Sequence, residues 1–392
     1  MGDSGGSGGI SVFFGGALQG SSAAVFHNDS SGGQTITANG SVTGTAGAGI
    51  YAQNGSLASN ITITTAVGTT VSGTVVGIGA DNNGVGAISI TTNGDVSGGS
   101  VQGIRATNNG SATTVKAYGD VSSTDSIGIY IYGETPSAGD ITLITGDSTN
   151  GVTGGTAGIV IRGDGTTGDV IVNAQGDVTG KAGDGIFATN SNGDTLSITT
   201  GASTSVTGAD DGIRASSGAG ATSITANGEV RGTNDAGIEA YNDTNASDLT
   251  VTAGAKVEGG TFGVYAFNNG KGFVRVTANG DVTGTVEDGI RAESGGTDLT
   301  VTADAMVTGG KSGIAANNSG GGETEITANG AVTGTAAYGI HAENGGTATH
   351  LTVTAGATVM GGQRGILTSN KGTGATKIRA TSDVTGTLRA GI

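Results

Sequence analysis

Two groups of residues have types and spacing that could support chemistry, and the first group is acidic. Asp184 and Asp211 each precede a Gly-Ile pair, and Asp210 and Asp235 extend the group. On strands stacked about 4.8 Å apart, two such carboxylates would repel, so that one pKa rises and the pair could act as acid and base on a polysaccharide. The same oxygens would suit calcium. The alternative is a group of solvated turn residues, because acidic residues outnumber basic ones by 32 to 16.

Neither a basic partner nor a calcium-loop motif accompanies these carboxylates. The three histidines, His27, His341 and His350, form no metal-binding or catalytic pattern, and no phosphate-binding loop is present. We therefore predict no catalytic residue, no metal site and no cofactor, and expect a protein that is not an enzyme.

The second group consists of arginine and aromatic residues on the segment that follows each Gly-Ile or Gly-Val pair. Seven of the fourteen Tyr and Phe residues and four of the nine arginines fall on one face of this segment. They are Tyr51, Arg105, Tyr130, Tyr132, Arg162, Phe187, Arg214, Tyr241, Tyr265, Phe267 and Arg291. Exposed aromatic and arginine side chains are typical of recognition surfaces, here for a sugar or a protein. A ladder of side chains that only stiffens the fold is the alternative.

A repeat of about 26 residues positions both groups. Its landmark is the aliphatic residue after glycine, at Ile50, Ile78, Ile104, Ile129, Ile159, Ile186, Ile213, Ile238, Val264, Ile290, Ile314, Ile340, Ile366 and Ile392. Val25 marks an earlier, degenerate unit. A column of valines precedes the landmarks, at Val42, Val71, Val96, Val121, Val152, Val178, Val206, Val230, Val257, Val282, Val307, Val332, Val359 and Val384. A third aliphatic column runs from Ile36 to Ile378 through segments such as Leu-Thr-Val-Thr.

Each repeat thus contains three short alternating segments separated by Asn-Gly, Gly-Asp and Gly-Gly pairs, which is typical of strands joined by tight turns. One repeat cannot bury its own aliphatic side chains, but stacked repeats can. The sequence therefore predicts an all-β, single-stranded parallel β-helix of about 14 coils, right-handed by the usual crossover rule. Glycine at 81 residues with a single proline, Pro136, agrees with close turns and uninterrupted strands. We expect residues 1–34 to form a degenerate N-terminal coil or cap, and residues 35–392 to form one continuous repeat array.

The repeated Ala-Asn-Gly-Asp-Val-Thr-Gly-Thr blocks, of which residues 278–285 are the clearest, and Leu-Thr-Val-Thr-Ala at residues 249–253 resemble the passenger region of bacterial autotransporters. The absence of cysteine also matches this family, which includes pertactin-like and diffuse-adherence β-helices. The resemblance implies a place at the bacterial cell surface or outer membrane, or secretion, through a C-terminal outer-membrane barrel. It also implies adhesion, aggregation or a part in biofilms and virulence. No signal peptide and no barrel segment are recognisable in the sequence, so we expect a passenger fragment.

The predicted function is that of a surface adhesin or aggregation factor with a host or bacterial surface protein or glycan as its partner. The chain could also associate with itself. A structural stalk for a distal head and a polysaccharide-degrading β-helix are the alternatives. With a net charge of −16 and no basic cluster, nucleic acid is not an expected partner.

Overall fold

The computed structural model describes residues 2–3, 8–134, 139–147 and 149–392. These residues form β-strands and no helix, arranged as a parallel solenoid of about 14 right-handed coils of about 26 residues, so the predicted fold class is confirmed. Across this described part of the chain, no helix is long and apolar enough to cross a membrane. Residues 1 and 4–7 of the expected N-terminal cap, and Pro136, lie outside the described residues. The chain divides into two compact units, residues 1–197 and 198–392, which are described separately.

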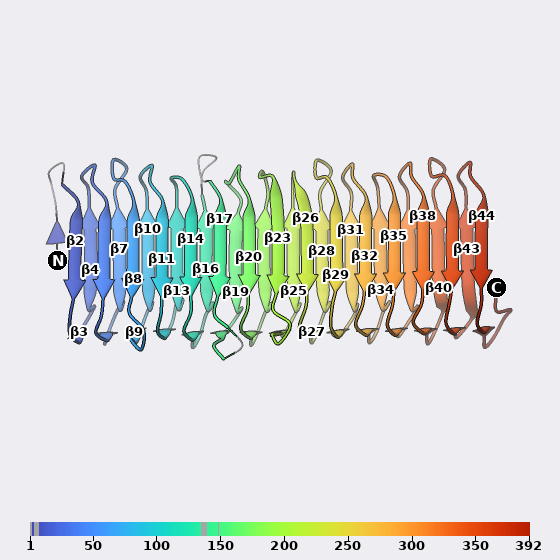
Figure 1. Cartoon of the computed structure of the whole chain (residues 1–392), viewed down its shortest axis with the longest axis horizontal. Helices are drawn as coiled ribbons and strands as arrows, with labels where there is room; N and C mark the ends of the chain where they lie inside the picture. Colours follow the sequence, from blue (N-terminus) through green and yellow to red (C-terminus); the bar gives the residue numbers. More distant parts are fainter. Residues whose placement is uncertain (1, 4–7, 135–138, 148) are drawn as a thin grey trace. The chain divides into compact units, whose positions relative to one another are not determined.

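In the first unit, each coil contributes one strand to each of three parallel sheets, A, B and C (Figure 1). Sheet A contains β1 (Gly2–Asp3), β4 (Ala24–Asn28), β7 (Ile50–Asn54), β10 (Ile78–Asn82), β13 (Ile104–Asn108), β16 (Ile129–Gly133), β19 (Ile159–Gly163) and β22 (Ile186–Asn190). Sheet B contains β2 (Ile10–Phe14), β5 (Gln34–Ala38), β8 (Ile61–Thr65), β11 (Ile88–Thr92), β14 (Thr113–Ala117), β17 (Ile141–Thr145), β20 (Val170–Ala174) and the start of β23 (Thr195–Thr200). Sheet C contains β3 (Leu18–Gly20), β6 (Val42–Gly44), β9 (Val71–Gly73), β12 (Val96–Gly98), β15 (Val121–Ser123), β18 (Val152–Gly154) and β21 (Val178–Gly180).

The second unit repeats this architecture. Its sheet A contains β25 (Ile213–Ser217), β28 (Ile238–Asn242), β31 (Val264–Asn268), β34 (Ile290–Ser294), β37 (Ile314–Asn318), β40 (Tyr338–Asn344) and β43 (Arg364–Asn370). Its sheet B contains β26 (Ala221–Ala226), β29 (Leu249–Ala253), β32 (Val274–Ala278), β35 (Leu299–Ala303), β38 (Thr324–Ala328), β41 (Leu351–Ala355) and β44 (Thr376–Ala380). Its sheet C contains β24 (Ser205–Gly208), β27 (Glu229–Gly232), β30 (Val257–Gly259), β33 (Val282–Gly284), β36 (Val307–Gly309), β39 (Val332–Gly334), β42 (Val359–Gly361) and β45 (Val384–Gly386).

Neighbouring strands within each unit pair so that like residues lie opposite one another. Ile78, for example, lies opposite both Ile50 and Ile104. Thirteen of the fourteen column valines are buried, and the last, Val384, is half-buried. One predicted alignment is wrong by a residue: Ala24 rather than Val25 lies opposite Ile50, because the first coil lacks the Gly-Ile pair that marks the others.

Glycine is abundant because the backbone passes close to neighbouring coils. Among the described residues, only Gly68 has a left-handed φ, of +73°. A Cβ on Gly259, the last residue of β30, would overlap the carbonyl group of Phe262. A Cβ on Gly103, directly before Ile104, would lie 2.7 Å from Val121 Cγ1. The Gly-Ile pairs therefore mark a corner at which a side chain larger than hydrogen does not fit.

Asparagine closes most strands of sheet A, and its side chain points into the core. The buried examples are Asn28, Asn54, Asn82, Asn108, Asn190, Asn242, Asn268, Asn318 and Asn344. Asn268 Nδ2 donates hydrogen bonds to the carbonyl oxygens of Ser247, at 2.8 Å, and Phe273, at 3.2 Å. Its Oδ1 accepts one from the backbone N–H of Gly270, at 2.8 Å. The buried amides thus satisfy backbone groups of the connections between sheets A and B.

Candidate functional site

The eleven predicted arginine and aromatic residues all lie at the second or fourth position of sheet A strands, where the side chain points away from the core. In the first unit they are Tyr51 on β7, Arg105 on β13, Tyr130 and Tyr132 on β16, Arg162 on β19 and Phe187 on β22. In the second unit they are Arg214 on β25, Tyr241 on β28, Tyr265 and Phe267 on β31, and Arg291 on β34. Most of them are half-buried rather than exposed, because side chains of neighbouring coils cover one another.

In the first unit, Tyr51 and Arg105 meet above Gly79, which lies between them in the sheet. The Tyr51 hydroxyl donates a 2.5 Å hydrogen bond to Asp81 Oδ2, and Arg105 forms an ion pair with the same oxygen. The Arg105 guanidinium also lies 5.8 Å from the centre of the Tyr51 ring. Burial, followed by the bond to Asp81, raises the pKa of Tyr51 to about 12. The three side chains thus bind mainly one another.

A second cluster of the first unit is more open. The Tyr130 and Tyr132 ring centres lie 6.4 Å apart. On the following strands, the Arg162 guanidinium lies 5.8 Å from the centre of the Phe187 ring. Burial raises the pKa of the Tyr130 hydroxyl. Aromatic rings beside an exposed arginine are the side chains that most often dominate binding interfaces.

The second unit contains an aromatic ladder formed by Tyr241, Phe267, Tyr265 and Phe262. Tyr241 stacks on Phe267, with centres 5.2 Å apart and planes at 17°. Tyr265 stacks on Phe262 at 5.2 Å and 30°, and the Arg291 guanidinium lies 5.7 Å from the Tyr265 centre. Burial, followed by the charge of a neighbouring glutamate, raises the pKa of Tyr265. The stacked rings cover one another's faces.

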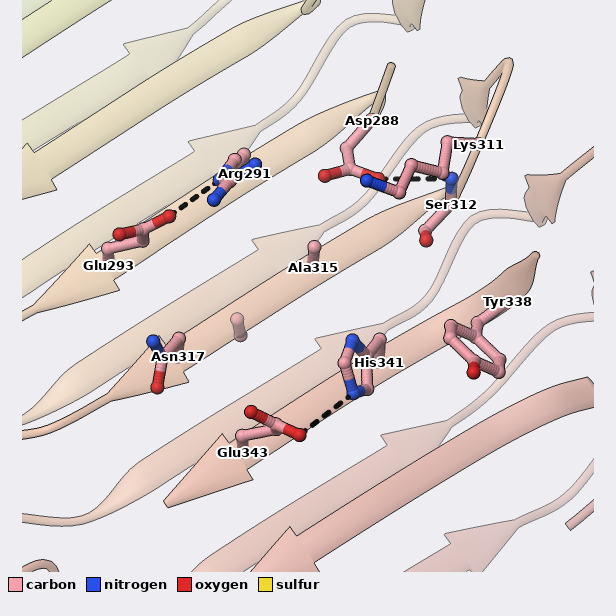
Figure 2. Close-up of a pocket in the computed structure, with 11 residues that line it drawn as sticks. Asp288, Arg291, Glu293, Lys311, Ser312, Ala315, Asn317, Tyr338, His341 and Glu343 are labelled. Carbon is pink, nitrogen blue, oxygen red and sulfur yellow. Dashed lines mark hydrogen bonds and ion pairs between the residues drawn. The ribbon is translucent and has the colours of Figure 1, made fainter. Parts of the chain in front are cut away.

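Next to this ladder, the sheet A surface is hollowed where a small side chain separates two large ones. Ala315 on β37 lies between Arg291 on β34 and His341 on β40. Figure 2 shows Ala315 and Asn317 between these flanking side chains, with Tyr338 beside His341. The hollow has a volume of about 270 Å³. It is an outward-facing depression of one sheet and involves three successive coils.

Pairs of polar side chains surround this hollow. Arg291 Nε lies 2.5 Å from Glu293 Oε1, and His341 Nε2 lies 3.3 Å from Glu343 Oε1 (Figure 2). Asp288 is buried and accepts a 3.0 Å hydrogen bond from the backbone N–H of Ser312, and burial raises the pKa of its carboxyl group. Donors and acceptors therefore alternate around the hollow, which suits hydrogen bonding to a polar ligand.

The predicted acidic group is divided between the two units. Asp184 is half-buried in the first unit. In the second unit Asp211 is buried and accepts a 2.8 Å hydrogen bond from the backbone N–H of Ala236. Asp210 and Asp235 are exposed, and Asp235 accepts a 2.5 Å bond from the Thr261 hydroxyl. Within the part of the chain that the structure describes, no three His, Asp or Glu side chains are arranged to hold a metal ion.

Several residues of these clusters were not singled out from the sequence, among them Asp81, Phe262 and Tyr338. Asp81 joins Tyr51 to Arg105, Phe262 lies in the corner before β31, and Tyr338 is the first residue of β40. Phe262 and Tyr338 both stand two residues before a landmark aliphatic residue, a position that the repeat could have revealed. No protein-family model, curated protein or solved structure matches the chain significantly.

Proposed function

We propose that this chain is the passenger β-helix of a bacterial autotransporter and that it acts as an adhesin or aggregation factor at the cell surface. It would bind ligands on host or neighbouring cells through the outward face of sheet A. The parallel β-solenoid is consistent with such a passenger or with a stalk. The observation that favours a binding role over that of a structural stalk is the concentration of arginine and aromatic side chains on one of the three sheets.

The other two sheets differ clearly in their outward side chains. The outward residue of a sheet C strand is usually Thr or Ser, as at Thr283 on β33 and Thr308 on β36. Sheet B strands commonly present two threonines, as at Thr250 and Thr252 on β29. Threonine follows from strand propensity alone, whereas Tyr, Phe and Arg are the residues that carry most binding energy at interfaces. Sheet A therefore has the composition of a binding face.

The proposed mechanism is multivalent. The clusters and the hollow are spread over many coils, and none is a deep pocket. Several weak contacts to a repetitive cell surface add through effective concentration, so the avidity can exceed each single affinity by about 10²–10⁴. A rigid scaffold lowers the entropy cost of each further contact.

The test uses the complete chain, labelled at a single cysteine introduced by Thr308→Cys on sheet C, because the protein has no cysteine of its own. Binding to epithelial cells and to bacterial cells is measured by flow cytometry. The test variant combines Tyr130→Ala, Tyr132→Ala and Arg162→Ala. We expect it to bind at least about tenfold more weakly, as when several aromatic or arginine anchors are lost.

The matched control changes the same two coils on another face, with Thr142→Ala, Ile144→Ala and Asn173→Ala on β17 and β20 of sheet B. It should bind as the unchanged chain does. Equal binding by the test variant and the control would remove sheet A of the first unit from the proposal. A chain that binds neither type of cell would be a stalk.

A further inference from the structure

A second hollow on sheet A of the second unit lies between β25 and β28. Its volume is about 250 Å³, and it is lined by Arg214, Ala215, Ser216, Glu239 and Tyr241. Ser216 lies opposite Tyr241 in the sheet. A small side chain therefore forms the floor and a large ring forms one wall. Because sites for drug-sized ligands occupy roughly 300–1,000 Å³, this hollow suits a single small unit.

The wall is the end of the aromatic ladder. The ring of Tyr241 stacks on Phe267, which lies opposite it on β31, with only 17° between the two planes. The other face of Tyr241 is therefore directed toward the preceding strand, where Ser216 is too small to cover it. Tyr241 is 38% exposed and is the only aromatic side chain of the predicted set among the exposed large hydrophobic residues. The ladder thus ends in one uncovered ring face.

We infer that this hollow binds an uncharged pyranose unit of a cell-surface glycan, with the sugar ring stacked on Tyr241. The inference rests on the proposed adhesin function and names its ligand class. One face of a pyranose presents C–H groups, which are attracted to the negative face of an aromatic ring. Its rim carries hydroxyl groups, which need both donors and acceptors nearby.

The rim of the hollow provides those polar groups. Arg214 Nε and Glu239 Oε2 form an ion pair with a separation of 3.1 Å and lie opposite one another beside the ring. A guanidinium donates and a carboxylate accepts, so together they match neighbouring hydroxyls of a sugar. The two charges cancel and the whole chain has a net charge of −16. An anionic sugar is therefore less suited than an uncharged one.

The inference is tested by saturation-transfer NMR on the complete chain with methyl β-D-glucopyranoside, methyl β-D-galactopyranoside and methyl α-D-mannopyranoside, and with methyl β-D-glucuronide as the anionic comparison. The blocking variant is Ser216→Tyr, which adds one ring to the ladder and fills the hollow without removing a wall. Tyr241→Ala removes the stacking face. We expect at least one neutral pyranoside to bind, and either variant to weaken it about tenfold or more, as expected when a central aromatic anchor is lost.

Two variants serve as controls. Tyr241→Phe keeps the ring and should bind within about twofold of the unchanged chain, since hydroxyl loss at a stacking ring is a minor change. Thr225→Tyr adds an aromatic residue to sheet B of the same coil and should leave binding unchanged. Melting temperatures show whether each variant is folded.

Several results would overturn the inference: no signal from any neutral pyranoside, tighter binding of the glucuronide, or full binding by Ser216→Tyr. These results are distinct from failure of the adhesin proposal. If the chain binds cells but no pyranoside, adhesion stands and the ligand of this hollow is a protein surface or nothing. If a pyranoside binds in the hollow but cells do not, the sugar site stands and adhesion is lost.

Discussion

Replacing Asn268 by alanine should destabilise the second unit although the change removes no large apolar side chain. Asn268 is fully buried at the end of β31 and forms three hydrogen bonds with backbone groups. Alanine leaves the carbonyl oxygens of Ser247 and Phe273 and the N–H of Gly270 without these partners. Ser247 is exposed, and the half-buried Phe273 oxygen still accepts a 2.9 Å hydrogen bond from the Leu249 N–H. The buried Gly270 N–H therefore bears most of the loss.

The magnitude follows from the three bonds. A protein hydrogen bond contributes about 0.5–1.5 kcal/mol, and a buried group left without its partner costs about 1–3 kcal/mol. We therefore expect Asn268→Ala to lower the free energy of unfolding by about 3 kcal/mol. Asn268→Ser should cost less, because serine occupies the equivalent position at Ser217, where its hydroxyl donates a 3.3 Å hydrogen bond to the carbonyl oxygen of Gly220. The hydroxyl of a serine replaces part of the amide's hydrogen bonding.

The assay is equilibrium urea unfolding followed by far-UV circular dichroism, combined with amide hydrogen exchange at Gly270. Asn269→Ala is the matched control, because Asn269 is the next residue and its side chain is exposed. The control should change stability by less than about 0.5 kcal/mol. If Asn268→Ala behaves like the control and Gly270 keeps its protection, the buried amides are not structural.

Three further predictions concern single sites. Burial raises the pKa of Asp288 in the folded protein, so the stability that is present below the pKa of the unfolded chain is lost as the pH rises through the folded-state pKa. Asp288→Asn should therefore raise the melting temperature at neutral pH but not at acidic pH. An equal shift at both pH values would contradict this prediction. In an ultraviolet titration of the tyrosine hydroxyls, Tyr51 should be the last to lose its proton, near pH 12, and Asp81→Asn should move this step toward pH 10. A step that does not move would show that Asp81 does not affect the Tyr51 hydroxyl. Gly259→Ala should lower the free energy of unfolding by more than about 4 kcal/mol, because the new Cβ would overlap the carbonyl group of Phe262. A Cβ at Gly321 has no heavy atom within 4 Å, so Gly321→Ala should leave stability unchanged. Similar melting temperatures for the two variants would exclude close packing as the reason for glycine at position 259.

The architecture was predictable because each aliphatic column repeats at a constant position in the coil. Val257 and Val282, for example, lie opposite one another as their shared place in the repeat requires. The buried asparagines escaped prediction because a polar residue next to glycine is typical of a turn. Only stacking shows that Asn268 lies inside the core rather than at the surface. A fixed position four residues after each landmark was the available signal.

The sequence was enough to predict which face of the sheet carries the candidate site, but not the shape of the hollows on that face. Alternation along the strand placed Tyr241 and Arg291 outward, as the structure has them. The hollows depend on the relative sizes of residues about one coil apart, such as Ser216 below Tyr241 or Ala315 beside His341. Phe262 covers Tyr265 from a corner whose path the sequence does not specify. Side-chain exposure was therefore overestimated where neighbours cover one another.

The stacking of like residues on like also creates an ambiguity during folding. Val257 pairs with Val282, which pairs with Val307, so a coil that skipped its neighbour would still place valine on valine. Competing registers of similar energy slow folding and trap misfolded chains. Unlike pairs between adjacent coils reduce this ambiguity, as in the ion pairs of Arg231 with Glu258 and of Lys311 with Glu287. Charged residues on the outer faces thus help each coil distinguish its correct neighbour from the otherwise similar ones.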